Sequence, residues 1–254
     1  MKRDNISIKF ASDNKMVNGM LHLPDREIYP CNAKTPLVVG SHGLEGSMES
    51  AKQQLFAQIL PENGFAFLRF DHRGCGKSEG NFVEETSLLK RVEDMLCAVD
   101  YALSLKLTSE QIFLFGSSLG GSTCIAAWSK LVDKGLIPLG AILCAAPVNS
   151  LTIQRIPLNG NEHRPTLPMS FFEKNLLFDL TDKIKDLSNI LIFHGDNDKT
   201  VPVENGYTLY NNAKEPKKLI VLKGGDHQMT NREDQKMFEV ESLAWIKRCF
   251  SIQP

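Results

Sequence analysis

The chain has 254 residues, of which 42% are hydrophobic and 23% charged, so it is long enough for one large α/β domain or two small ones and has an ordinary globular composition; we favour one domain. The formal net charge is -1 and no long basic or acidic block is present, which argues against nucleic acid and anionic membrane surfaces as partners. The six cysteines are scattered, without a C-x-x-C pair or zinc spacing. We therefore expect reduced thiols, no metal and a cytoplasmic location.

We expect neither a secretory signal nor a membrane span in this chain. No apolar segment follows the first charged residues, and the longest apolar stretch, residues 136–148, contains a proline and a glycine and is too short to cross a bilayer. Residues 76–78 resemble the end of a phosphate-binding loop, but the first glycine of that motif would fall on Asp71. Residues 74–80 resemble a dinucleotide-binding motif, but Glu79 stands at its third glycine position. We therefore expect no nucleotide cofactor and no membrane partner.

The first predicted elements form an antiparallel β-hairpin. Residues 6–10 and 16–23 alternate apolar with polar side chains, and turn-forming residues separate them. Further predicted strands span residues 36–40, 65–70, 111–115, 140–145, 190–194 and 218–222, and predicted helices span residues 49–60, 86–105, 203–212 and 232–250, with one more after residue 118. This order predicts a mostly parallel central sheet with helices on both faces.

The segment 149–186 interrupts the alternation of strands and helices. It carries several prolines, no clear period, and then the aromatic pair Phe171 and Phe172. A long insert of this apolar content between two strands is more typical of an active-site lid than of a disordered linker. We predict one domain over residues 1–254, with a lid at about 149–186.

Residues 116–120, with the sequence GSSLG, form a complete G-x-S-x-G pattern between a predicted strand and a predicted helix. Such a turn holds its central serine in a strained conformation, and the glycines leave room for the crowded backbone. Centring the pattern on Ser117 would need glycines where Phe115 and Leu119 stand. Ser118 is therefore the candidate nucleophile.

A serine nucleophile needs a histidine base, and the base needs a carboxylate that fixes its tautomer. Two loops after later predicted strands offer these groups. The sequence HGDNDKTVP at 194–202 contains Asp196 and Asp198, and the sequence GGDH at 224–227 ends on His227. The order serine, carboxylate, histidine is that of enzymes with a nucleophile elbow. Asp226, beside the histidine, fits a turn-forming role.

These motifs resemble those of the α/β-hydrolase family of serine hydrolases. In that family an H-G-x-x-D-x-x-V-P segment carries the triad acid and a G-x-x-H segment the base, which implies Asp198 and His227, with Asp196 as the alternative acid. The sequence SHGL at 41–44 matches the oxyanion loop, which implies the backbone N–H groups of Leu44 and Leu119 as the oxyanion hole.

A further family motif, D-x-R-G-x-G-x-S, matches residues 71–78, so the resemblance covers about residues 36–250 and implies an α/β-hydrolase fold. We expect His42 to hold the oxyanion loop, and His72 and Arg73 to tie loops together. His163, in the insert, is expected to be a solvated loop residue.

The resemblance implies a carboxylesterase that cleaves a small-molecule ester with a Ser-His-Asp triad, through an acyl-enzyme and without a cofactor. The length and short insert are similar to those of small feruloyl or cinnamoyl esterases and of serine aminopeptidase-like hydrolases. A thioesterase or aminopeptidase-like hydrolase with the same triad, and a non-catalytic binding protein of the same fold, are the alternatives. The sequence leaves open the physiological substrate and whether the protein is a monomer or a homo-oligomer.

Overall fold

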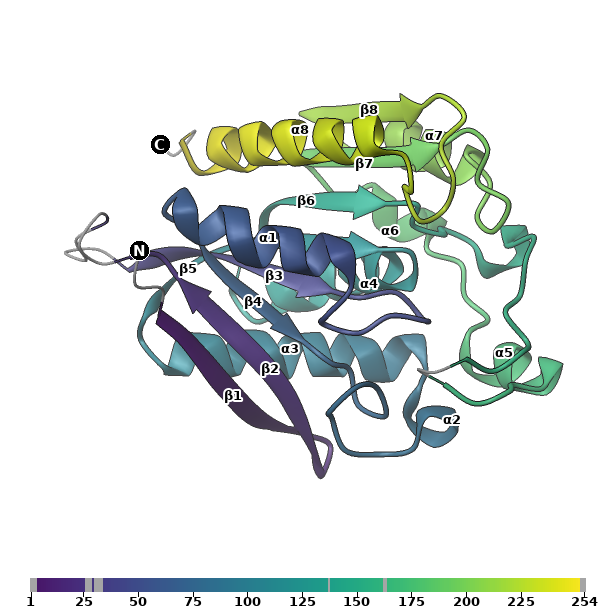
Figure 1. Cartoon of the computed structure of the whole chain (residues 1–254), viewed down its shortest axis with the longest axis horizontal. Helices are drawn as coiled ribbons and strands as arrows, with labels where there is room; N and C mark the ends of the chain where they lie inside the picture. The colour runs from purple at the N-terminus through teal and green to yellow at the C-terminus, as the bar shows by residue number, and fades with distance from the viewer. Residues whose placement is uncertain (1–3, 26–28, 30–33, 137, 162–163, 252–254) are drawn as a thin grey trace.

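The computed structural model describes residues 4–25, 29, 34–136, 138–161 and 164–251, and His163 lies outside these ranges (Figure 1). Within them eight strands form one sheet, in the spatial order β1-β2-β4-β3-β5-β6-β7-β8. The strands are β1 (Asp4–Ser12), β2 (Lys15–Leu23), β3 (Thr35–Ser41), β4 (Ala66–Phe70), β5 (Thr108–Ser117), β6 (Pro138–Cys144), β7 (Ile190–Gly195) and β8 (Lys217–Leu222). Strand β2 pairs antiparallel with β1 and β4, and all other pairs are parallel, which confirms the predicted hairpin and mostly parallel sheet.

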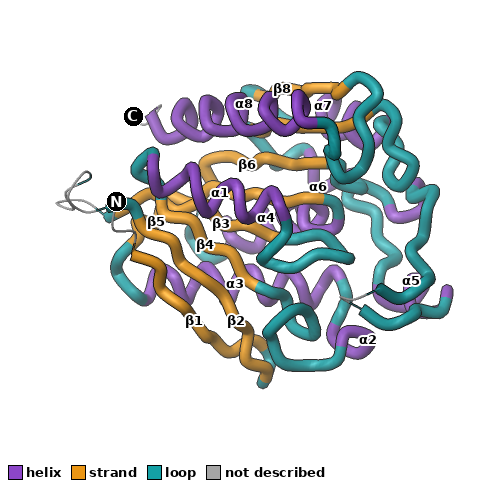
Figure 2. Tube along the Cα trace, viewed as in Figure 1, coloured by secondary structure: helices purple, strands orange, loops and turns teal. Residues whose placement is uncertain are grey.

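Helices cover both faces of this sheet, as predicted (Figures 1 and 2). One face carries α1 (Ala51–Glu62) and α8 (Arg232–Ser251), and the other carries α3 (Leu88–Ser104), α4 (Leu119–Asp133) and α7 (Glu204–Asn212). Along β5, Ile112 and Leu114 join the core beneath α3 and α4, whereas Phe113 and Phe115 join the core beneath α1 and α8. Because both faces are buried, the strand reads as one continuous apolar run.

The predicted elements differ from the observed ones mainly at their ends. Helix α1 begins at Ala51 rather than at residue 49, because Ser50 has the extended backbone of an N-cap residue. Strand β6 ends at Cys144 rather than at residue 145, because Ala145 has a positive φ of 45°. The one-turn helix α2 (Phe82–Glu85) is not predicted, since four residues cannot show a helical period.

The segment 149–186 contains the 3-10 turn Ser150–Thr152 and the short helices α5 (Met169–Asn175) and α6 (Thr181–Ile184). An isolated antiparallel bridge joins Asn149, its first residue, to Asp179, which lies seven residues before its end. In its middle, Leu167 and Phe171 pack in one apolar cluster with Leu119. The segment is therefore packed onto the sheet edge where β5 ends. Of the helices in the described ranges, none combines the length and apolar content of a membrane span.

The loop after β4 is tied to α3 and to the hairpin turn by buried polar groups, as expected for His72 and Arg73. Arg73 Nε donates to Asp94 Oδ1 over 2.7 Å, and its Nη2 donates to Ser12 Oγ over 2.9 Å. His72 Nδ1 lies 3.2 Å from Asp94 Oδ2, and its Nε2 lies 2.8 Å from Ser41 Oγ. Burial alone would raise the pKa of Asp94, but the hydrogen bonds and charges of His72 and Arg73 outweigh it and lower this pKa to about 2.

We expect Asp94→Asn to lower the free energy of unfolding by about 2 kcal/mol at pH 7, because Arg73 loses its one fully buried carboxylate partner and keeps only the partly exposed Asp13 and Glu93. The folded-state pKa of Asp94 lies below the unfolded value, so its contribution is complete above about pH 4 and is lost as the pH falls towards 2. The deficit of the variant should therefore shrink in acid. Urea unfolding between pH 7 and pH 2.5 measures it.

The control is Asp100→Asn, which removes a half-exposed carboxylate from the same helix. It should change stability by less than about 0.5 kcal/mol. An Asp94→Asn deficit that stayed constant down to pH 2.5 would contradict the assigned pKa.

Candidate active site

The candidate nucleophile occupies the turn between β5, which ends at Ser117, and α4, which begins at Leu119. Ser118 has φ 54° and ψ -127°, a left-handed backbone that residues with a side chain rarely adopt. Its N–H donates to the carbonyl of Cys144 at the end of β6 over 2.8 Å. The strained turn is thus fastened to the neighbouring strand, and it places the serine at the carboxyl edge of the sheet.

The glycines of the pattern allow three backbone segments to meet at this turn. A Cβ on Gly116 would lie 2.3 Å from the carbonyl oxygen of Gly120, and a Cβ on Gly120 would lie 2.1 Å from that of Ser41. A Cβ on Gly121 would lie 2.5 Å from the Cβ of Ala146. Any larger residue at these positions would force backbone atoms apart, so the glycines are needed for close packing.

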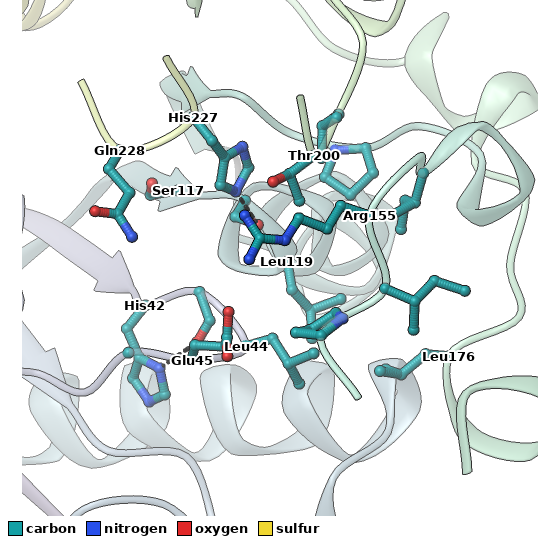
Figure 3. A pocket seen from close by; sticks show the side chains of 18 of the residues that line it. His42, Leu44, Glu45, Ser117, Leu119, Arg155, Leu176, Thr200, His227 and Gln228 are labelled. Atoms are coloured by element: carbon teal, nitrogen blue, oxygen red, sulfur yellow. Dashed lines mark hydrogen bonds between the residues drawn. The ribbon is translucent and has the colours of Figure 1, made fainter. Parts of the chain in front are cut away.

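The structure brings the three predicted triad residues into one hydrogen-bonded series. His227 Nε2 lies 3.1 Å from Ser118 Oγ, and His227 Nδ1 lies 2.7 Å from Asp198 Oδ2. Figure 3 shows the ring of His227 at the cavity. The other carboxylate oxygen of Asp198 accepts the N–H groups of Thr200 and Val201 over 2.8 and 2.9 Å. Burial would raise the pKa of Asp198, but His227 and these backbone donors lower it overall. The carboxylate is therefore ionised beside the histidine.

The other two carboxylates considered from the sequence have turn-forming contacts. Asp196 Oδ1 accepts the N–H of Gly224, which joins the loops after β7 and β8. Asp226 accepts the N–H of Thr230 over 2.9 Å and also its hydroxyl. The acid that meets His227 through a hydrogen bond is thus Asp198, and Asp226 has the role expected of it.

His194, at the end of β7, supports the acid loop and had no predicted role. Its Nε2 lies 2.8 Å from the carbonyl oxygen of Val201 and 3.6 Å from Asp198 Oδ2. Burial lowers the pKa of His194, so the ring is neutral and its Nε2–H donates to Val201. The sequence did contain a signal for this supporting role, because His194 is the first residue of the HGDNDKTVP motif.

The loop after β3 is held by His42, as predicted. His42 Nδ1 lies 2.7 Å from the carbonyl oxygen of Gly43, and its Nε2 accepts the N–H of His72 over 3.1 Å. Burial, and then the charges of Arg91 and His72, lower the pKa of His42 well below 6.5, so the ring is neutral. The fully buried Arg91, which sequence reasoning missed, donates to the carbonyl of His42.

The two predicted oxyanion donors lie beside the serine. Leu44 and Leu119 line the same cavity as Ser118, and a Cβ on Gly43 would be 3.3 Å from that of Ser118. Among the described residues, the N–H groups of Leu44 and Leu119 have no hydrogen-bond acceptor. Both N–H groups are therefore available to a bound molecule.

A cavity of about 1330 Å³ opens above Ser118 and is walled by the loops after β3, β7 and β8 and by the segment 149–186. Its apolar wall contains Leu44, Leu119, Ile153, Ile156, Phe172 and Leu176. The segment is fastened to the oxyanion loop because the buried Arg164 donates to Glu45 over 2.6 Å. In the described part of the chain, no group of His, Cys, Asp or Glu is placed to hold a metal ion.

Fold and site together define an α/β-hydrolase of the serine type. Residues 32–160 match the family model described as "Serine aminopeptidase, S33", and the chain belongs to this family of α/β-hydrolases.

Relatives with curated descriptions include protein YfhR of Salmonella typhi, which is 30% identical over 87% of this chain and 74% of the relative. Human protein ABHD12B is 29% identical over 75% of this chain and 55% of the relative. The mouse mitochondrial palmitoyl-protein thioesterase ABHD10 is 26% identical over 84% and 75%. The chain spans 65% of YfhR from Escherichia coli O157:H7 and 55% of ABHD12B, so these relatives are longer than the aligned region.

Solved structures share the fold. Est1E from Butyrivibrio proteoclasticus with bound ferulic acid superposes with a TM-score of 0.77 at 24% identity, covering 94% of this chain and 99% of that one. The α/β hydrolase GrgF from Penicillium sp. sh18 gives a TM-score of 0.77 at 19% identity, covering 99% and 100%. The family and fold predictions are therefore confirmed.

We expect Gly120→Ala to destabilise the protein by about 3 kcal/mol. The new Cβ would collide with the carbonyl oxygen of Ser41, and both backbone segments are fixed in the core. The matched control is Gly135→Ala. Gly135 also has a positive φ, 79°, but no described atom lies within 4 Å of its would-be Cβ, so about 1 kcal/mol is expected from backbone strain alone. Urea unfolding compares the two, and equal losses would show that close packing at the turn is unimportant.

Proposed function

We propose that the protein is a carboxylesterase that hydrolyses a small-molecule ester through an acyl-enzyme on Ser118. The observation that carries this proposal is the series of hydrogen bonds from Asp198 through His227 to Ser118 at the floor of the cavity. A neutral imidazole whose Nδ1–H is held by a carboxylate presents its Nε2 lone pair to the serine hydroxyl. This arrangement suits proton transfer from the serine.

The proposed reaction has two acyl-transfer steps. Ser118 Oγ attacks the ester carbonyl carbon while His227 Nε2 accepts the hydroxyl proton, and the N–H groups of Leu44 and Leu119 stabilise the oxyanion. The tetrahedral intermediate then expels the alcohol, which takes the proton from His227. In the second step water gives a proton to His227 and attacks the acyl carbon, and the intermediate then releases the acid while Ser118 Oγ takes the proton back from His227. Neither step needs a cofactor.

We further propose that residues 1–254 form one domain in which the segment 149–186 acts as a lid. The segment supplies most of the apolar wall of the cavity and is tied to the oxyanion loop by Arg164 and Glu45. Substrate selection is expected to depend on this wall, which includes Phe172 and Leu176. The five free thiols in the described ranges fit the proposed cytoplasmic location.

A thioester is the second candidate substrate. The relative described as a palmitoyl-protein thioesterase and the apolar wall of the cavity both favour it. A feruloyl or cinnamoyl ester is favoured by the fold match to Est1E with bound ferulic acid. The same triad and oxyanion donors would serve all of these acyl bonds.

The test compares kcat/KM for 4-nitrophenyl butyrate, methyl ferulate, an acyl-coenzyme A thioester and alanine 4-nitroanilide. We expect the wild type to prefer one of the esters, and Ser118→Ala to lose at least about 10⁴-fold in kcat/KM. The matched control is Ser117→Ala, which removes the adjacent hydroxyl and should retain activity within about tenfold.

Activity that survives in Ser118→Ala would overturn the proposed nucleophile. A folded wild type that turns over none of the four substrates would favour a non-catalytic binding protein.

A further inference from the structure

Several charged side chains that line the cavity already have partners. Glu45 is paired with the buried Arg164, and Asp226 accepts hydrogen bonds within its own turn. Lys52 Nζ donates to the carbonyl of Gln228 over 2.9 Å, beside the candidate base. These groups support the loops that build the site.

Three other charged side chains of the cavity lining lack such partners in the described part of the chain. Arg155, Glu173 and Lys199 are exposed to the cavity side and have no hydrogen-bond or ion-pair partner among the described residues. Glu173 belongs to α5 in the middle of the insert, where Phe171 packs against Phe82 of α2 (Figure 1). Among the described residues, neither Arg155 nor Lys199 forms an ion pair with the carboxylates of the cavity lining.

Arg155 and Lys199 come from two segments that are joined by a backbone hydrogen bond. The N–H of Gln154 donates to the carbonyl oxygen of Thr200 over 2.9 Å, so each cation is one residue from this junction. Lys199 directly follows the candidate acid Asp198 in the chain. Figure 3 shows the Arg155 side chain extending from the insert into the cavity, on the side where His227 lies. Both charges thus stand beside the proposed reaction centre.

Two unpaired cations on adjoining segments make this wall of the cavity positive, which favours a bound anion. The planar guanidinium of arginine matches a carboxylate with two parallel hydrogen bonds, and a lysine ammonium adds a point charge. We propose that Arg155 and Lys199 form an anion subsite, and that the substrate is an ester that carries a second, ionised carboxylate near the scissile carbonyl. This inference rests on the proposed esterase function.

The experiment uses two pairs of esters, and the members of each pair differ by one carboxylate. Mono-4-nitrophenyl glutarate and 4-nitrophenyl pentanoate place or omit the carboxylate on the acyl side, and 4-carboxyphenyl butyrate and phenyl butyrate do so on the alcohol side. We expect the wild type to show about tenfold higher kcat/KM for the anionic ester of one pair, a preference that weakens with added salt. Arg155→Gln and Lys199→Gln should each reduce this preference, and leave kcat/KM for the neutral esters within about twofold.

The matched control is Lys174→Gln, which removes an exposed cation from α5 of the same insert that does not line the cavity. It should keep the preference of the wild type, and Arg155→Lys should keep part of it. An absent preference in both pairs, or one that Arg155→Gln leaves unchanged, would overturn the anion subsite.

A binding measurement separates failure of the subsite from failure of the esterase proposal. Ser118→Ala and the double variant Ser118→Ala/Arg155→Gln are titrated calorimetrically with glutarate and with pentanoate, which needs no turnover. Tighter binding of glutarate that is lost in the double variant supports the subsite even if the wild type hydrolyses no ester. Equal binding of the two acids, or no binding of glutarate, overturns the subsite whatever the activity.

Discussion

The close packing of backbone around Ser118 is the constraint on which the rest of the site depends. A left-handed serine fits between β5 and α4 because Gly116 and Gly120 lack a Cβ, which lets the end of β3 lie against the first turn of α4. The same contact brings the loop after β3, with Gly43, beside the serine. The parallel strands then place the acid and base loops at the same sheet edge, so one turn sets the position of every proposed catalytic group.

Buried polar side chains hold the loops that converge on this turn. Arg73 and Asp94 fix the loop after β4, Arg91 donates to the oxyanion loop, and His194 donates within the acid loop. Burying such groups is costly unless they are hydrogen-bonded, and each bond here joins a loop to a helix or a strand. Buried polar groups are therefore found where the loops must be held in one conformation. Packing of apolar side chains alone would not fix those loops as closely.

Much of the fold and the candidate triad was predictable, because the relevant signals are local. Buried strands read as apolar runs, and Ser118, Asp198 and His227 each lie in a short motif whose backbone geometry constrains its neighbours. The ion pair between Arg164 and Glu45 could not be predicted, since its partners lie 119 residues apart and neither belongs to a motif. For the same reason, only the folded structure shows that the side chain of Arg155 lines the cavity without an ion-pair partner among the described residues. Contacts made across the fold leave no periodic trace in the sequence.

We propose that this turn makes Ser118 a nucleophile activated by His227. Reaction of the folded protein with a fluorophosphonate, followed by intact-protein and peptide mass spectrometry, tests this directly. We expect one covalent adduct per chain, on the side chain of Ser118, and no adduct in Ser118→Ala. A folded wild type that remains unlabelled, or an adduct on Ser117 or on any other residue, would contradict it.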